Sequence, residues 1–224
     1  MKNRKMAISL IVVLCCVIMA IVDGIWQPDY PVKSVIKIVL FIGFPFIYSL
    51  FDSKINLKDI FVPNKKGMKM AFSLCIPVFL LILGAYLLLK DVFDFSKVTT
   101  ALTGNIGVNK DNFVYVALYI SFINSLLEEF FFRGFAFLTL KRVASEKFAY
   151  VFSAVAFSLY HIAIMTGWFS VIVFVITVAG LFAGGLIFNY LNSKSNNIYT
   201  SWLVHMFSNF AINLIGFMLF GILQ

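Results

Sequence analysis

The chain has 224 residues, of which 62% are hydrophobic and 12% are charged, and its mean hydropathy is +0.97. Soluble globular domains carry about 25% charged residues, so this composition excludes a soluble fold. The net charge of +8 does not indicate nucleic-acid binding, because most Lys and Arg residues lie in short segments beside apolar runs, as membrane topology requires. We therefore expect an all-α, polytopic transmembrane helical bundle with the lipid bilayer as its surroundings and no nucleic-acid partner.

The apolar runs follow one another along the chain, and most are about as long as the roughly 20 residues that cross a bilayer. They cover residues 6–22, 35–51, 70–89, 113–140, 148–165, 168–190 and 198–223. We expect a turn over residues 23–34, which contain Pro28 and Pro31. Residues 90–112 form either a loop or a short interfacial helix, so about 7–8 membrane helices are expected. In the sixth run, the spacing of Gly180 and Gly184 is one that lets helix backbones approach closely.

The distribution of basic residues predicts the orientation of the bundle. With the N-terminus in the cytoplasm, twelve Lys and Arg residues fall in cytoplasmic segments and four on the opposite side, while Lys37 and Arg133 lie inside apolar runs. Cytoplasmic segments carry the excess of Lys and Arg in membrane proteins. We therefore predict an integral membrane protein with a cytoplasmic N-terminus. Its compact form favours a prokaryotic plasma membrane, and we treat residues 1–224 as a single transmembrane domain.

The fourth run contains charged residues that a bilayer does not tolerate without a reason. Glu128 and Glu129 are two of only three glutamates in the chain, and Arg133 follows them. A charge near the bilayer centre costs at least about 2.5 kcal/mol, so such residues face a protein interior or a wet cavity. Glu129 and Arg133 are four residues apart and can pair on one helix face, whereas Glu128 can face elsewhere. A polar stripe recurs at steps of three or four residues ahead of Glu128: Ser121, Asn124 and Ser125.

Both histidines of the chain, His161 and His205, also lie within apolar runs, and Asn209 shares a helix face with His205. Together with Glu128 they supply a carboxylate, two imidazoles and an amide, which can activate water and stabilise an oxyanion. The same Glu and His side chains could equally bind a metal, as in His₂Glu zinc hydrolases, although the H-E-x-x-H motif is absent. In either case Glu128, His161 and His205 are predicted to meet, and a separation above about 10 Å, too wide for one bridging water, would contradict this.

The charged residues, histidines and asparagine form three motifs in a fixed order on successive membrane segments. They are Glu128-Glu129-x-x-x-Arg133, Phe157-x-x-x-His161 and His205-x-x-x-Asn209. This combination resembles the CPBP family of intramembrane metalloproteases, which comprises the type II CAAX prenyl endopeptidases and the bacteriocin-processing or bacteriocin-immunity (Abi) proteins. The resemblance covers roughly the C-terminal half and implies a catalytic core at about residues 113–213.

The resemblance also implies a role for each motif residue. Glu128 would activate the hydrolytic water with help from His161, while His205 and Asn209 would bind or polarise the scissile carbonyl. Supporting roles would fall to Glu129, Arg133 and Phe157. A zinc ion held by Glu128, His161 and His205 is one implied cofactor, and a metal-free mechanism with the glutamate as general base is the other.

The function expected from this resemblance is an endopeptidase that cleaves membrane-associated or lipid-modified proteins and peptides. Two alternatives explain the buried charges in other ways. One is a non-catalytic bacteriocin self-immunity or scaffold protein that binds a partner through its helices. The other is a proton-coupled transporter in which the Glu and His residues relay protons, although no pair of inverted repeats with matching broken helices is evident.

Overall fold

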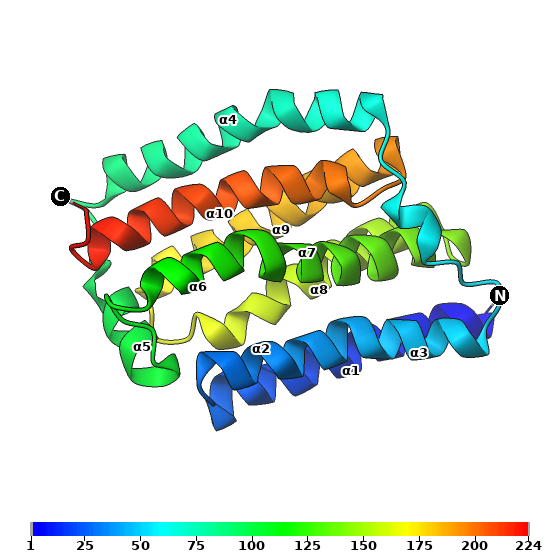
Figure 1. Cartoon of the computed structure of the whole chain (residues 1–224), viewed down its shortest axis with the longest axis horizontal. Helices are drawn as coiled ribbons and strands as arrows, with labels where there is room; N and C mark the ends of the chain where they lie inside the picture. The colour runs from blue at the N-terminus through cyan, green and yellow to red at the C-terminus, as the bar shows by residue number, and fades with distance from the viewer. Residues whose placement is uncertain (1, 224) are drawn as a thin grey trace.

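A computed structural model describes residues 2–223, and it confirms the predicted all-helical membrane architecture (Figure 1). Within this range, seven helices are long and apolar enough to cross a membrane. The spans are Asn3–Trp26, Tyr30–Phe51, Lys65–Leu89, Phe113–Arg142, Glu146–Ile164, Val171–Ser195 and Tyr199–Leu219. The connection between the third and fourth spans holds α5 (Ser96–Ile106), whose 11 residues are too short to cross.

Several spans are built from more than one helical element. The first is α1 (Lys2–Ile21) with a π-helical end (Val22–Trp26), and the second is α2 (Tyr30–Ile38), a π-helical segment (Val39–Gly43) and α3 (Phe44–Phe51). The fourth is α6 (Phe113–Tyr119), a π-helical segment (Ile120–Asn124), α7 (Ser125–Glu128), a longer π-helical segment (Glu129–Thr139) and a 3₁₀ turn (Leu140–Arg142). The single-helix spans are α4 (Lys65–Leu89), α8 (Glu146–Ile164), α9 (Val171–Ser195) and α10 (Tyr199–Leu219).

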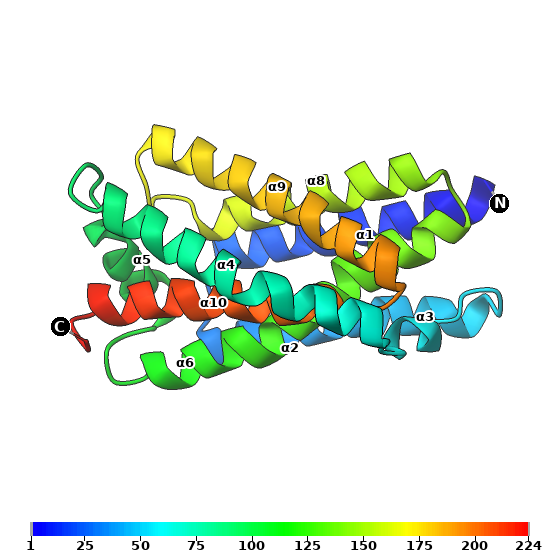
Figure 2. The ribbon, with the colours of Figure 1, turned by 90° about the horizontal axis from the view of Figure 1, so that it is seen from above.

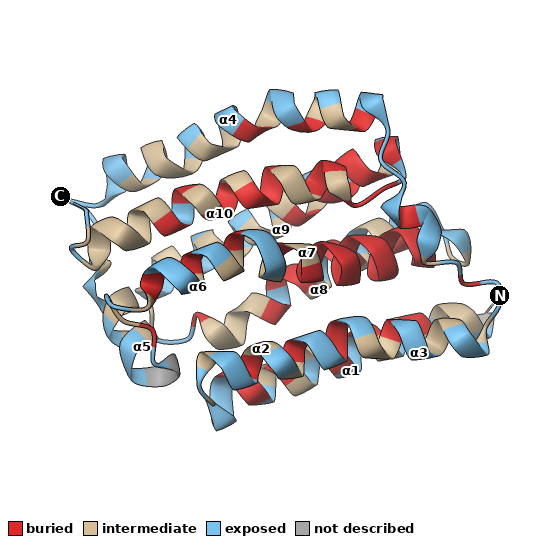
Figure 3. Ribbon diagram, in the orientation of Figure 1, coloured by how far each residue is buried: buried red, intermediate tan, exposed pale blue. Residues whose placement is uncertain are grey.

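The fourth span is the central element of the bundle (Figures 1 and 2). Its first half packs against α10, and its second half packs against α1, α8 and α9. Around it, α4 runs along α10 and α8 runs along α9. Every residue of Glu129–Thr139 is buried, and this part of the span is continuously red in Figure 3. The charged motif of the fourth run therefore lies in the protein interior, as intramembrane charges require.

Aromatic packing joins the second span to the fourth. The ring of Phe41 stacks on that of Phe131 with a centroid distance of 4.1 Å and an interplanar angle of 7°, and it meets Phe132 and Tyr160 at 5.5 Å. On the outside, large apolar side chains such as Leu81 and Leu88 are exposed. An apolar outer surface around a core that contains charged groups is the arrangement expected of a protein in lipid.

The turn predicted over residues 23–34 is wrong at both of its ends. Only Gln27–Asp29 interrupts the two helices, because the first span continues to Trp26 and α2 begins at Tyr30 with Pro31 in its first turn. Proline is well tolerated at this position, where its missing N–H has no intrahelical partner. As a consequence, Lys33 lies inside α2 and is buried against Asp23 at 2.6 Å.

The expected close approach through Gly180 and Gly184 is also wrong. A Cβ atom built at either glycine would have no neighbour within 4 Å. The adjacent Gly185 makes the close contact instead, since a Cβ there would lie 3.1 Å from Cα of Ala154 in α8. The helices do approach at a small residue, but on a face about 100° away from the one that Gly184 occupies.

Candidate active site

Three elements bring the predicted catalytic side chains together at the centre of the bundle. Glu128 ends α7, His161 lies near the end of α8, and His205 lies in the second turn of α10. Oε2 of Glu128 is 3.8 Å from Nε2 of His161 and 3.8 Å from Nε2 of His205. The prediction that these three side chains meet is therefore confirmed.

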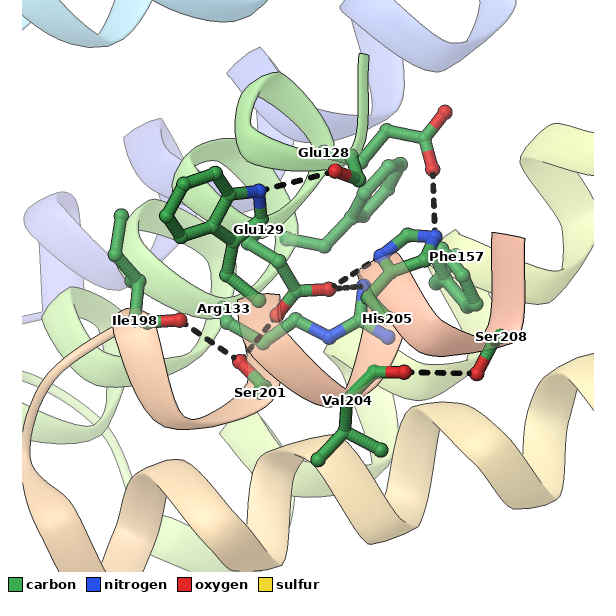
Figure 4. Close-up of polar contacts among 12 residues, drawn as sticks. Glu128, Glu129, Arg133, Phe157, Ile198, Ser201, Val204, His205 and Ser208 are labelled. Atoms are coloured by element: carbon green, nitrogen blue, oxygen red, sulfur yellow. Dashed lines mark hydrogen bonds and ion pairs between the residues drawn. The ribbon is translucent and has the colours of Figure 1, made fainter. Parts of the chain in front are cut away.

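Hydrogen bonds set the orientation of both imidazole rings. Nδ1 of His161 donates to the carbonyl of Phe157 at 2.8 Å, and Nδ1 of His205 donates to Oε1 of Glu129 at 2.9 Å. Because a carbonyl or carboxylate oxygen only accepts, the proton of each neutral ring is on Nδ1. Each Nε2 atom consequently presents a lone pair, and both face the same oxygen of Glu128. Figure 4 shows this contact for His205.

Glu129 is the centre of a second, fully buried cluster (Figure 4). Oε1 accepts from His205 and lies 3.5 Å from a guanidinium nitrogen of Arg133, while Oε2 accepts from the hydroxyl of Ser201. That hydroxyl also accepts from the side-chain amide of Asn192 at 2.8 Å. The carboxylate is thus fixed from three sides, and it fixes the ring of His205 in turn. Ser201 was not predicted from the sequence, because a serine in an apolar helix is common.

Arg133 is held by aromatic rings and by one carboxylate. Its guanidinium carbon lies 3.9 Å from the ring centroid of Phe157 and 4.9 Å from that of Phe188. The side chain is fully buried, and its three nitrogens make no hydrogen bond with a correct geometry among the described residues. The Phe157 ring also meets His161 edge to face at 4.7 Å. The Phe157 ring therefore contacts both the Arg133 guanidinium and the His161 ring.

Lys37 in α2 contacts the predicted base directly, and no role for it is predicted from the sequence. Its ammonium lies 3.1 Å from Oε1 of Glu128 and 2.6 Å from Oδ1 of Asn124. Nδ2 of Asn124 donates to the same Oε1 at 3.0 Å. The signal that could have identified Lys37 is its position in an apolar run, which calls for the same explanation as a buried glutamate.

Asn209 lies apart from these contacts. Its Nδ2 donates to the backbone carbonyl of Ile120 at 3.2 Å, and Asn213 likewise donates to the carbonyl of Ala117 at 3.1 Å. Within residues 2–223, no hydrogen bond joins Asn209 to Glu128 or to either histidine. Both asparagines therefore anchor α10 to the first half of the fourth span, beside its π-helical segment.

The residues do not fit a bound zinc ion in this arrangement, although their donor types suit one. Bonds of about 2.0–2.2 Å place neighbouring ligands of a tetrahedral zinc roughly 3.4 Å apart, whereas Glu128 is 3.8 Å from each histidine. The described residues contain no group of three or more His, Cys, Asp and Glu side chains arranged to hold a metal ion. Glu128 is already paired with the cation of Lys37, and a second cation beside it would be repelled.

Comparison with known proteins agrees with the motifs. The family model described as "Type II CAAX prenyl endopeptidase Rce1-like" matches residues 110–211, which include Glu128, His161, His205 and Asn209. No curated protein and no solved structure shows significant similarity to the chain. Residues 110–211 therefore match a domain of the Rce1-like type II CAAX prenyl endopeptidase (CPBP/Abi) family.

Proposed function

We propose that the chain is a glutamate-dependent intramembrane endopeptidase that hydrolyses peptide bonds of membrane-associated or lipid-modified proteins and peptides. The observation that carries the proposal is the placement of Oε2 of Glu128 at 3.8 Å from two imidazole lone pairs. Two acceptors at this separation can share one water that lies about 2.8 Å from each. Such a water donates both hydrogens to the protein and keeps an oxygen lone pair for attack on a carbonyl.

Glu128 is the general base in this proposal. It takes a proton from the water as the oxygen–carbon bond forms, and it later gives that proton to the leaving amine as the carbon–nitrogen bond breaks. His161 orients the water by accepting its second hydrogen at Nε2, since its Nδ1 proton is committed to the carbonyl of Phe157. Positioned general bases contribute about 10²–10⁴-fold to a rate.

His205 differs from His161 because a carboxylate, not a neutral carbonyl, accepts its Nδ1 proton. A carboxylate in this position stabilises the imidazolium form of a histidine. We infer that His205 takes up a proton from solvent at Nε2 when the substrate binds, donates it to the oxygen of the scissile carbonyl as the oxygen–carbon bond forms, and takes it back as the carbon–nitrogen bond breaks. Glu129, flanked by Ser201 and Arg133, supports this state.

Asn209 supplies the second donor to the substrate carbonyl in this scheme. It lies four residues beyond His205 and so on the same face of α10. One hydrogen of its amide is donated to Ile120, and the other remains for the substrate oxygen. Two donors to one developing oxyanion are the arrangement typical of acyl-transfer sites.

The surroundings of the site favour a substrate that is anchored in the bilayer. The fourth span is enclosed by membrane helices, so a substrate chain enters laterally between helices or from one end of the bundle. The basic residues at the start of α1, those before and at the start of α4, and those around the start of α8 lie at the same end (Figure 1). By the distribution of Lys and Arg, we assign this end and the N-terminus to the cytoplasm of a prokaryotic cell.

The test compares wild type with Glu128→Gln on a library of membrane-anchored and prenylated peptides, with the proteins purified in detergent. Glu146→Gln is the matched control, because Glu146 is the one other glutamate and is exposed at the start of α8. Wild type and the control are expected to cleave the same peptides, and Glu128→Gln is expected to lose at least about 10²-fold in rate. Since the donors do not form a metal site, cleavage should persist in the presence of a chelator.

Equal cleavage by wild type and Glu128→Gln would refute the role of Glu128. If wild type cleaves no peptide of the library, the result favours a non-catalytic immunity or scaffold protein over an endopeptidase. Loss of wild-type cleavage on chelation, restored by added zinc, would mean that the three donors rearrange around a metal.

A further inference from the structure

Lys37 is a charged residue buried in the second membrane span, outside the residues that match the family. Its side chain is 8% exposed, and its ammonium lies between Glu128 and Asn124. Resting on the proposed function, we propose that Lys37 is a positioning residue of the hydrolytic site. It holds one oxygen of Glu128 so that the other faces both histidines and the attacking water.

The two oxygens of Glu128 have separate partners. Oε1 accepts from the Lys37 ammonium at 3.1 Å and from Nδ2 of Asn124 at 3.0 Å. Lys37 and Asn124 are also bonded to each other at 2.6 Å, so the three groups form a closed triangle. Within residues 2–223 no side chain donates to Oε2, which faces only the histidine lone pairs. Rotation of the carboxylate plane away from this orientation would break both bonds to Oε1.

The packing of the second span against the fourth fixes the position of Lys37 along the axis of α2, beside Glu128. Phe41 follows Lys37 by one turn and stacks on Phe131, which follows Glu128 by three residues. The ammonium lies 5.0 Å from the ring centroid of Tyr160 and 5.8 Å from that of Phe41. These rings form an apolar wall beside the lysine. They leave the carboxylate and the amide as its polar partners.

The same helix provides a matched comparison. Lys33 lies one turn before Lys37, is also buried, and pairs with Asp23 at 2.6 Å. Loss of either ammonium leaves one buried carboxylate without its cation. Only loss of the Lys37 ammonium frees an oxygen of Glu128. A positioning role therefore predicts that two variants with similar structural damage differ in catalysis.

The experiment measures kcat and KM of Lys37→Met and Lys33→Met in detergent, with the peptide that wild type cleaves fastest in the library above. Lys37→Met is expected to lose about 10²-fold in kcat, the size of loss that small misplacements cause, with KM nearly unchanged. A loss confined to kcat means that an interaction needed in the transition state is missing. Lys33→Met is expected to retain the wild-type kcat.

If Lys37→Met does not fold, Asn124→Ala tests the same claim without changing the charge. It removes one donor to Oε1 and the anchor of the ammonium, and a loss of about tenfold in kcat is expected, as for other groups that orient a catalytic side chain. Wild-type kcat in a folded Lys37→Met or Asn124→Ala protein would overturn the proposal. Equal losses in Lys37→Met and Lys33→Met would also overturn it. Unchanged cleavage by Glu128→Gln would instead refute the proposed function itself.

Discussion

Replacement of Arg133 by leucine tests whether the second carboxylate of the site depends on its cation. Arg133 and Glu129 are both fully buried, and their charged atoms are 3.5 Å apart. At an effective dielectric constant of about 20, unit charges at this distance attract by roughly 5 kcal/mol. Because Ser201 and His205 still bind the carboxylate in the variant, we expect a loss of roughly 3–5 kcal/mol, the range measured when one partner of a buried pair is removed.

The assay is unfolding by increasing mole fractions of sodium dodecyl sulfate in mixed micelles, followed by tryptophan fluorescence. Arg142→Leu is the control, since Arg142 belongs to the same span and pairs with Asp59 at 3.1 Å, but both side chains are substantially exposed. Exposed ion pairs contribute about 0–1 kcal/mol, so this variant should unfold close to wild type.

The double variant Arg133→Leu with Glu129→Gln completes the test. It removes both charges, and the neutral amide still offers an oxygen to His205. If the cost of Arg133→Leu comes from an unpaired carboxylate, the double variant should be more stable than the single one by roughly 1–3 kcal/mol. The reasoning is refuted if Arg133→Leu unfolds like wild type, or if Glu129→Gln adds a further loss instead of a recovery.

Two further predictions concern packing and support of the site. Gly185→Leu should destabilise the protein by several kcal/mol, because its Cβ alone would lie 3.1 Å from the α8 backbone at Ala154. Gly184→Leu should be tolerated, and equal unfolding midpoints for the two variants would contradict the structure.

Ser201→Ala removes a hydrogen bond to the charged Glu129, so we expect a loss of about 1.5–3 kcal/mol in stability. In the same variant kcat should fall about 10-fold or more, and an unchanged kcat would argue against support of the histidine by Glu129.

The membrane spans could be predicted from the sequence because apolar length is a strong signal, but their ends could not. Tyr30–Ser34 was expected to be a turn, yet these residues begin α2. In this helix the polar residue Lys33 is buried and pairs with Asp23 across the helix boundary. That contact exists only in the folded bundle, so local composition does not reveal it.

The π-helical segments could not be predicted from the sequence either. In one of them, Ile120–Asn124, the carbonyl of Ile120 accepts from Asn209 in a helix that lies about 90 residues away. A change from the α-helical to the π-helical hydrogen-bond pattern leaves backbone groups that need partners elsewhere in the fold, as the carbonyl of Ile120 finds in Asn209. The sequence nevertheless predicted that Glu128 and both histidines meet, since a few polar residues in apolar helices have few explanations.

Charge balance explains why the N-terminal spans matter to a site whose motifs lie in the C-terminal half. Each buried carboxylate has its own cation: Arg133, from the same helix, serves Glu129, and Lys37, from α2, serves Glu128. With neutral histidines these four charges cancel, as burial in a membrane protein requires. Residues 110–211 alone contain both carboxylates but only one of the two cations. The second span therefore supplies one of the two cations of this cluster, because without Lys37 the Glu128 carboxylate would be buried with an unbalanced charge.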